Sequence, residues 1–98
     1  MNVLTYQEIE AAVRTLLRRY HAQGALLFGS YARGEATPDS DLDLIILGGR
    51  DFVSRDIFSL AEDLREMTGK GADVFEICEV NTGTPFYETV MREGIRIA

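Results

Sequence analysis

The first part of the chain carries hydrophobic residues spaced first as in a helix and then as in a strand. Apolar side chains recur every three or four positions from Ile9 to Tyr20, which predicts a helix with one buried face. Thr5, with Glu8 three positions later, matches a capping box, so we expect the helix to begin there. A short apolar run at 25–28 follows, which is typical of a buried strand.

A second strand is predicted over 41–47, where hydrophobic and acidic residues alternate. Side chains two positions apart on a strand point to the same side, so Leu42 and Leu44 are expected to face the core. Asp41 and Asp43 then project together from the other side. Between the two strands we expect a helical turn at 31–34 and a loop at 35–40.

The next helix is expected to be capped by Asp51 or Ser54 and to end near Thr68. Its spacing predicts a buried stripe formed by Phe58, Ala61, Leu64 and Met67.

A third strand is predicted after the glycine turn at 69–71. Asp73 opens it, and its apolar residues are Val74, Phe75, Ile77 and Val80. Cys78 falls within this strand, so we expect a packed thiol there.

The last helix is predicted to start at Thr84-Pro85 and to end at Gly94, followed by a possible edge strand over 95–98. The complete order alternates helices with strands. It predicts an α/β (α+β) fold, with a small mixed sheet of three to four strands flanked by helices, in a single domain over residues 1–98.

Composition and charge narrow the function. Of the 98 residues, 46% are hydrophobic and 27% are charged, which is typical of a globular domain. The net charge of −6 disfavours direct binding to nucleic acid through a broad basic surface. We expect no membrane-spanning helix and no secretory signal. With one cysteine and no possible internal disulfide, a cytoplasmic location is expected.

The candidate chemistry lies in the carboxylates around the second strand. Asp41 and Asp43 repel one another when both are ionised, unless a cation lies between them. Hard divalent cations such as Mg²⁺ prefer carboxylate oxygens. If the third strand pairs with the second, Asp73 joins the other two, and three carboxylates can hold two ions for an in-line phosphoryl displacement.

Gly29 and Ser30 stand where the first strand gives way to the helical turn. Free backbone N–H groups at such a point favour an anion, and glycine lets a phosphate approach closely. The Ser30 hydroxyl adds a donor. The residues therefore predict phosphate binding at one end of the site and metal binding at the other.

The arrangement Gly29-Ser30, ten intervening residues, and then Asp41-Leu42-Asp43 resembles the signature of the polymerase β-like nucleotidyltransferase superfamily. The short length and the Gly-Ser-Tyr-Ala-Arg-Gly opening at 29–34 resemble its minimal nucleotidyltransferase (MNT) branch. Members of that branch are similar to the antitoxin partners of HEPN-domain ribonuclease toxins. The similarity covers nearly the whole chain.

The resemblance implies a role for each matching position. Asp41 and Asp43 would bind two Mg²⁺ ions, and Asp73 would complete one metal site and help to deprotonate the attacking hydroxyl. Gly29 and Ser30 would hold the triphosphate, with Arg33 able to reach a phosphate. The implied reaction transfers AMP from ATP to a hydroxyl, a tyrosine of the HEPN toxin in the antitoxin branch, and releases pyrophosphate. Tyr31 departs from the pattern, because many members carry a basic residue there.

Several alternatives stay open at the level of the sequence. Ser30 can be only a helix N-cap, Arg33 only a member of a surface ion pair, and Asp73 only a carboxylate at the start of a strand. The chain can also neutralise a partner by covering it, without catalysis. A nucleotidyltransferase that acts on RNA or on a small molecule is a third interpretation. The intact set of three aspartates favours the enzyme.

Overall fold

The computed structural model describes residues 2–79 and 83–98 of the chain. Within these residues four α-helices are formed: α1 (Tyr6–Tyr20), α2 (Gly29–Arg33), α3 (Ile57–Thr68) and α4 (Pro85–Glu93). The strands are β1 (Gly24–Phe28), β2 (Leu42–Leu47), β3 (Ala72–Glu76) and β4 (Ile95–Arg96). Short 3-10 turns occupy Ser54–Asp56 and Ile77–Glu79.

The four strands form one mixed sheet in the order β3-β2-β1-β4. β1 pairs antiparallel with both β2 and β4, whereas β2 and β3 run parallel. A parallel pair needs a crossover connection, and α3 supplies it. The predicted mixed sheet flanked by helices is confirmed, including its edge strand, which is limited to Ile95–Arg96.

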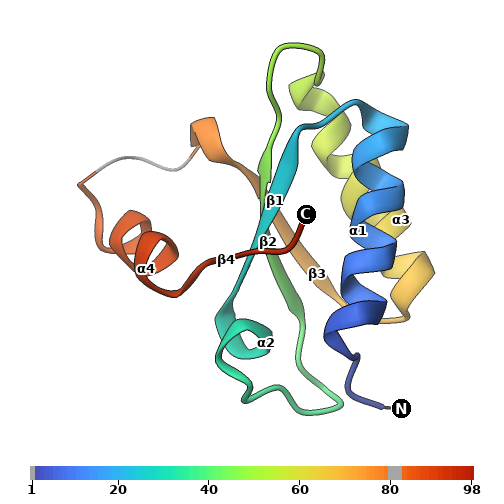
Figure 1. Cartoon of the computed structure of the whole chain (residues 1–98), viewed down its shortest axis with the longest axis vertical. Helices are drawn as coiled ribbons and strands as arrows, with labels where there is room; N and C mark the ends of the chain where they lie inside the picture. Colours follow the sequence, from blue (N-terminus) through green and yellow to red (C-terminus); the bar gives the residue numbers. More distant parts are fainter. Residues whose placement is uncertain (1, 80–82) are drawn as a thin grey trace.

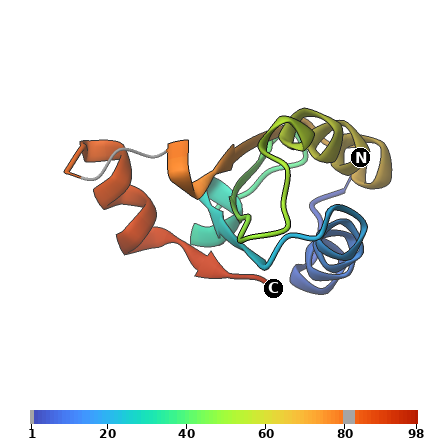
Figure 2. The same cartoon turned by 90° about the horizontal axis from the view of Figure 1, so that it is seen from above.

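Helices α1 and α3 cover one face of the sheet, and α4 lies on the opposite side (Figures 1 and 2). The main core lies between α1, α3 and the sheet, and it contains Leu42 and Leu44 as predicted. On the other face, Ile45 and Phe28 pack with Val90 of α4 in a smaller cluster. On this second face Asp73 and Phe75 of β3 remain exposed, so α4 covers it only in part.

The predicted capping box of α1 is confirmed. The Glu8 backbone N–H donates to the Thr5 hydroxyl oxygen at 3.1 Å, and the Thr5 N–H donates to Glu8 Oε1 at 2.8 Å. His21 ends the helix in the left-handed region, with φ of 60°. Among the described residues, no helix is long and apolar enough to cross a membrane.

The predicted buried stripe of α3 is wrong in two positions. The buried residues are Ile57, Leu60, Ala61 and Leu64, whereas Phe58 is 79% exposed and Met67 is also exposed. Successive residues lie about 100° apart around a helix, so Phe58 points away when Ile57 faces the core. The predicted caps are wrong as well, because α3 begins at Ile57 and its N-cap is Asp56, the last residue of the 3-10 turn that Ser54 opens.

The third strand is shorter than predicted. β3 ends at Glu76, and Ile77 begins a 3-10 turn, while Val80 lies outside the described residues. Cys78 is exposed in that turn, so the predicted packed thiol is wrong.

Candidate active site

The strand pairing brings Asp43 and Asp73 next to one another. In the parallel ladder between β2 and β3, Asp43 is the register partner of Asp73. Register partners point to the same side of a sheet, so both carboxylates project from the face that α4 only partly covers. The structure therefore places Asp73 beside Asp43, as the sequence predicts.

Asp41 lies directly before β2, at the same end of the sheet. The Leu42 N–H donates a 2.9 Å hydrogen bond to the Gly71 carbonyl oxygen, which draws the start of β2 against the turn before β3. A Cβ atom built on Gly71 would collide with Asp41 Oδ1. Glycine at position 71 thus leaves the space that the Asp41 carboxylate occupies.

Gly29 likewise leaves the space that the Asp43 carboxylate occupies. Its φ of 74° lies in the left-handed region, which favours glycine, and it turns the chain from β1 into α2. A Cβ atom at this position would collide with Asp43 Oδ2. The first residue of the predicted phosphate-binding turn therefore touches one of the predicted metal ligands.

The electrostatics of Asp43 reflect this crowding. Burial raises the pKa of its carboxyl group above the ordinary value, and the negative charges of Asp73 and Asp41 raise that pKa further. The positive charge of Arg33 acts in the opposite direction. The pKa of Asp43 thus depends on the charges of both other aspartates and of Arg33.

The donor set suits a hard divalent cation, which takes carboxylate oxygens and relieves repulsion between like charges. Among residues 2–79 and 83–98, however, no group of three or more His, Cys, Asp and Glu side chains is gathered closely enough to hold a metal ion. The structure thus pairs Asp43 with Asp73 and brings Asp41 within electrostatic reach, without closing the three into one cluster.

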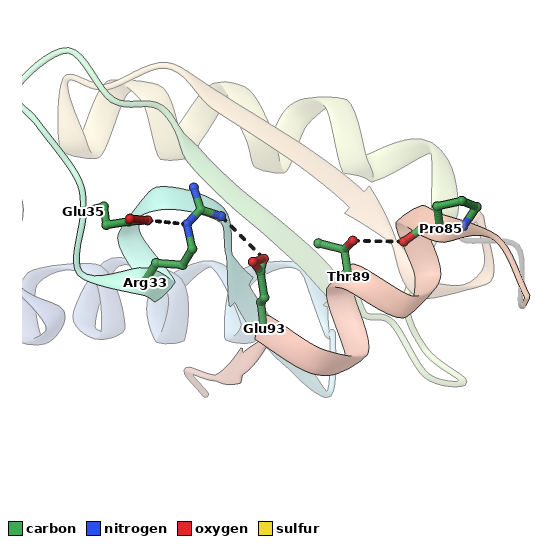
Figure 3. A network of polar contacts seen from close by, with 5 residues as sticks. All are labelled: Arg33, Glu35, Pro85, Thr89 and Glu93. Atoms are coloured by element: carbon green, nitrogen blue, oxygen red, sulfur yellow. Dashed lines mark hydrogen bonds and ion pairs between the residues drawn. The ribbon is translucent and has the colours of Figure 1, made fainter.

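Arg33 lies between the side chains of Glu35 and Glu93 (Figure 3). Its Nε atom donates to Glu35 Oε1 at 2.6 Å, and its Nη1 atom donates to Glu93 Oε2 of α4 at 3.5 Å. These contacts raise the pKa of the guanidinium, with the hydrogen bond to Glu35 as the largest cause. The ion-pair alternative for Arg33 is therefore realised, although its charge still acts on Asp43.

Ser30 is the second residue of α2 and not its N-cap. The N-cap is Phe28, whose side chain makes no capping hydrogen bond. The capping alternative for Ser30 is thus wrong. The first N–H groups of a helix have no partner inside it, so Gly29 and Ser30 present donors beside Asp43.

Two residues of the predicted glycine turn, Lys70 and Gly71, also contribute to the site. Besides Gly71, Lys70 is only 6% exposed, and its Nζ atom donates a 2.7 Å hydrogen bond to the Pro38 carbonyl oxygen. A charged residue at the centre of a Gly-Lys-Gly turn is ordinarily exposed, so only the unusual burial identifies it. The surface has a hollow lined by residues including Asn2 and Thr68, and another lined by residues including Arg14 and Gln23. Neither hollow contains a predicted site residue.

Carboxylates on two adjacent strands of a small mixed sheet, beside a glycine-led turn at the end of a third, define the class of nucleotidyltransferases. Comparison with known proteins gives the same class. Residues 10–98 match the family described as Polymerase beta, Nucleotidyltransferase. The chain belongs to this family, and it is a nucleotidyltransferase enzyme.

The chain is 30% identical to the protein adenylyltransferase MntA of Thermococcus cleftensis over 105 aligned positions, which cover 99% of this chain and 100% of that protein. Two solved complexes share the fold. A toxin–antitoxin complex with AMP-PNP has a TM-score of 0.77 and 24% identity, over 91% of this chain and 72% of that one. The tri-AMPylated HEPN toxin of Shewanella oneidensis in complex with MNT antitoxin has a TM-score of 0.72 and 22% identity, over 96% and 72% of the two chains.

Proposed function

We propose that this chain transfers AMP from ATP to a tyrosine hydroxyl of a cognate HEPN-domain ribonuclease toxin, and that it acts in this way as the antitoxin. The observation that carries the proposal is the pairing of Asp43 with Asp73 beside Gly29. This geometry puts the predicted metal ligands and the predicted phosphate-binding turn at one end of the sheet. The relatives described above support the donor and the partner, because one similar complex was solved with AMP-PNP and another contains an AMPylated HEPN toxin.

Asp41, Asp43 and Asp73 would hold two Mg²⁺ ions. When bound, the ions supply positive charge to the oxygens of the reacting phosphate and of the leaving pyrophosphate. The Gly29 and Ser30 donors orient the triphosphate, and Arg33 adds positive charge when it leaves its glutamate partners. The acceptor oxygen forms a bond to the α-phosphorus while the bond from that phosphorus to the α,β-bridging oxygen breaks. The hydroxyl proton moves to Asp73, and pyrophosphate leaves.

The remaining parts of the proposal concern partners and location. The acceptor comes on a partner protein in our proposal, in keeping with the similar complex that contains a tri-AMPylated HEPN toxin. The acidic balance of the chain disfavours nucleic acid as that acceptor. A cytoplasmic location agrees with the single cysteine.

The test is transfer of label from α-³²P-ATP to the purified cognate HEPN-domain protein, in the presence of Mg²⁺. Label is expected on a tyrosine of the partner, and Asp43→Asn and Asp73→Asn are expected to reduce transfer by at least a hundredfold. Asp51→Asn makes the same charge change at an exposed position in the loop before α3, and it should transfer normally.

Two outcomes would support other functions. If wild-type protein transfers no label but both it and the Asp41→Asn/Asp43→Asn double variant block the ribonuclease, the chain acts by covering its partner. If label goes to RNA or to a small molecule in place of the partner protein, the reaction is correct but the acceptor is not.

A further inference from the structure

Three phenylalanines form a cluster on the face of the sheet that carries the aspartates. The ring of Phe86 in α4 lies 5.7 Å from that of Phe28 and 5.6 Å from that of Phe75, measured between ring centroids. Both contacts are edge-to-face, which is a favourable geometry for aromatic pairs. Phe86 thus connects the end of β1 to β3.

The strand register locates this cluster next to the candidate site. Phe28 is the register partner of Asp43, and Phe75 is the partner of Ile45, two residues further along β2. Adjacent strands are about 4.8 Å apart, so a ring that contacts both β1 and β3 lies above the strand between them. Phe86 therefore lies above the Asp43–Ile45 segment of β2.

The cluster leaves ring surface open beside the carboxylates. Phe28 is buried, but Phe75 is 36% exposed and Phe86 is 40% exposed. Met91, also exposed on α4, lies five residues from Phe86 and so about 140° around the helix. The open apolar surface of the cluster thus comes from two partly exposed rings, which is far below the roughly 800 Å² that each partner buries in a stable protein interface.

We propose that the exposed faces of Phe75 and Phe86 form the subsite on which the base of the bound nucleotide stacks. This inference rests on the proposed function, because it assumes that the phosphates of the same nucleotide lie at Gly29 and Asp43. A nucleobase is flat, has apolar faces, and is connected through the ribose to the phosphates that the neighbouring groups hold. Stacking of a base on aromatic side chains strengthens binding by about five- to a hundredfold.

The test compares two ligands by isothermal titration calorimetry in the presence of Mg²⁺. One is α,β-methylene-ATP, which the transfer reaction cannot cleave, and the other is inorganic tripolyphosphate, which has no base. Phe86→Ala and Phe75→Ala should weaken binding of α,β-methylene-ATP by about five- to a hundredfold. Their affinity for tripolyphosphate should stay within about twofold of the wild-type value, because the phosphate and metal groups are unchanged.

Two further variants separate stacking from packing. Phe86→Trp keeps an aromatic face and should retain nucleotide affinity, whereas Phe86→Leu keeps apolar bulk and should lose it. Phe58→Ala is the matched control, because Phe58 is an exposed phenylalanine on α3, which covers the opposite face of the sheet. It should leave the affinity for both ligands unchanged.

The inference is wrong if Phe86→Ala weakens both ligands equally, since the ring would then act only through the fold. It is also wrong if the wild type binds both ligands equally well, or if the ring variants lose only the affinity for the HEPN-domain partner. In those cases the proposed transferase function survives. If the wild type binds neither ligand, the proposed function fails together with the subsite.

Discussion

Lys70 and Pro38 connect the two chain segments that lead into the aspartates. The buried Nζ atom of Lys70 donates a 2.7 Å hydrogen bond to the Pro38 carbonyl oxygen, across 32 positions of sequence. Pro38 belongs to the loop before Asp41, and Lys70 belongs to the turn before Asp73. This hydrogen bond, together with the one from Leu42 to Gly71, thus holds the segments that carry Asp41 and Asp73 against each other.

Removal of this bond should loosen the site as well as the fold. Lys70→Met keeps most of the side-chain volume but leaves the Pro38 carbonyl without its donor, so we expect the free energy of unfolding to fall by about 1–3 kcal/mol. Urea denaturation measures this change. In the same variant we expect kcat to fall about tenfold, and a larger Mg²⁺ concentration to be required for half-maximal activity.

Lys70→Arg is the control for the charge, because it retains a long cationic side chain with donors. It should recover at least part of the stability and of the Mg²⁺ dependence. If Lys70→Met loses stability but keeps its kcat and its Mg²⁺ requirement, Lys70 supports only the fold.

Gly29 and Gly34 allow backbone strain to be separated from contact with Asp43. Both have positive φ, of 74° and 72°, but a Cβ at Gly29 would collide with Asp43 whereas a Cβ at Gly34 would meet nothing within 4 Å. Alanine at either position should destabilise the fold by about 1–2 kcal/mol through the left-handed conformation alone. Only Gly29→Ala should also displace the Asp43 carboxylate, and we expect it to abolish Mg²⁺-dependent tripolyphosphate binding in calorimetry. Equal loss of binding in the two variants would contradict this role of Gly29.

The raised pKa of Asp43 predicts a pH dependence of stability in the absence of metal. The pKa of this carboxyl group is higher in the folded than in the unfolded chain. At a pH between these two pKa values, the group therefore takes up a proton when the chain folds. The free energy of unfolding therefore falls as pH rises from the ordinary value of 3.8 through the raised pKa. Asp43→Asn removes this penalty, so it should be more stable than the wild type at pH 7 in EDTA, and the advantage should vanish below pH 3.8.

Urea denaturation between pH 3 and pH 7 checks this expectation. Asp51→Asn removes one negative charge from an exposed loop and should show a smaller gain at pH 7. A stability gain for Asp43→Asn that persists unchanged at pH 3 would mean that packing, and not charge, is responsible.

The placement of the aspartates could be predicted from the sequence, because it depends on two local rules. Alternation along a strand puts Asp43 on the side opposite Leu42 and Leu44, and a helix between two strands favours a parallel pair. Together these rules bring Asp73 next to Asp43 once β2 and β3 are neighbours. No rule of this kind determines the separation of the three carboxylates, which depends on the balance between their repulsion and the surrounding contacts.

The errors in the prediction arise where the sequence supports two answers. Ala61 and Leu64 fit one helical stripe with Ile57 and another with Phe58, and only the packing of α3 on the sheet decides between them. The 3-10 turn that contains Cys78 follows an apolar strand without a proline or glycine to mark the boundary. The burial of Lys70 depends on a carbonyl group far away in the sequence, so no local pattern indicates it.

We expect the Arg33 guanidinium to exchange a glutamate partner for a phosphate group when the nucleotide binds. The Arg33 guanidinium lies 3.5 Å from the Glu93 carboxylate. Because exposed ion pairs contribute little stability, a bound triphosphate can replace Glu93 as the partner of this guanidinium. Glu93→Gln should then strengthen tripolyphosphate binding by about twofold, and Arg33→Ala should weaken it by about three- to tenfold. Glu88→Gln, the same change at an exposed position of α4, should have no effect in calorimetry. Stronger binding by Arg33→Ala would show that the guanidinium does not reach the phosphates.

Addition and removal of Mg²⁺ test the carboxylates without any nucleotide or partner. A ligand that binds only the folded chain stabilises it by an amount that grows with concentration, and a cation placed between Asp43 and Asp73 also relieves their repulsion. The melting temperature of the wild type should therefore rise by about 10 °C in 10 mM Mg²⁺ and return on addition of EDTA, because ~2 kcal/mol of stabilisation is expected for a dissociation constant near 0.3 mM. Asp43→Asn and Asp73→Asn should lose most of this rise, whereas Asp51→Asn should keep it. An equal rise in all four proteins would mean that Mg²⁺ acts on the overall negative charge of the chain and has no specific site at these aspartates.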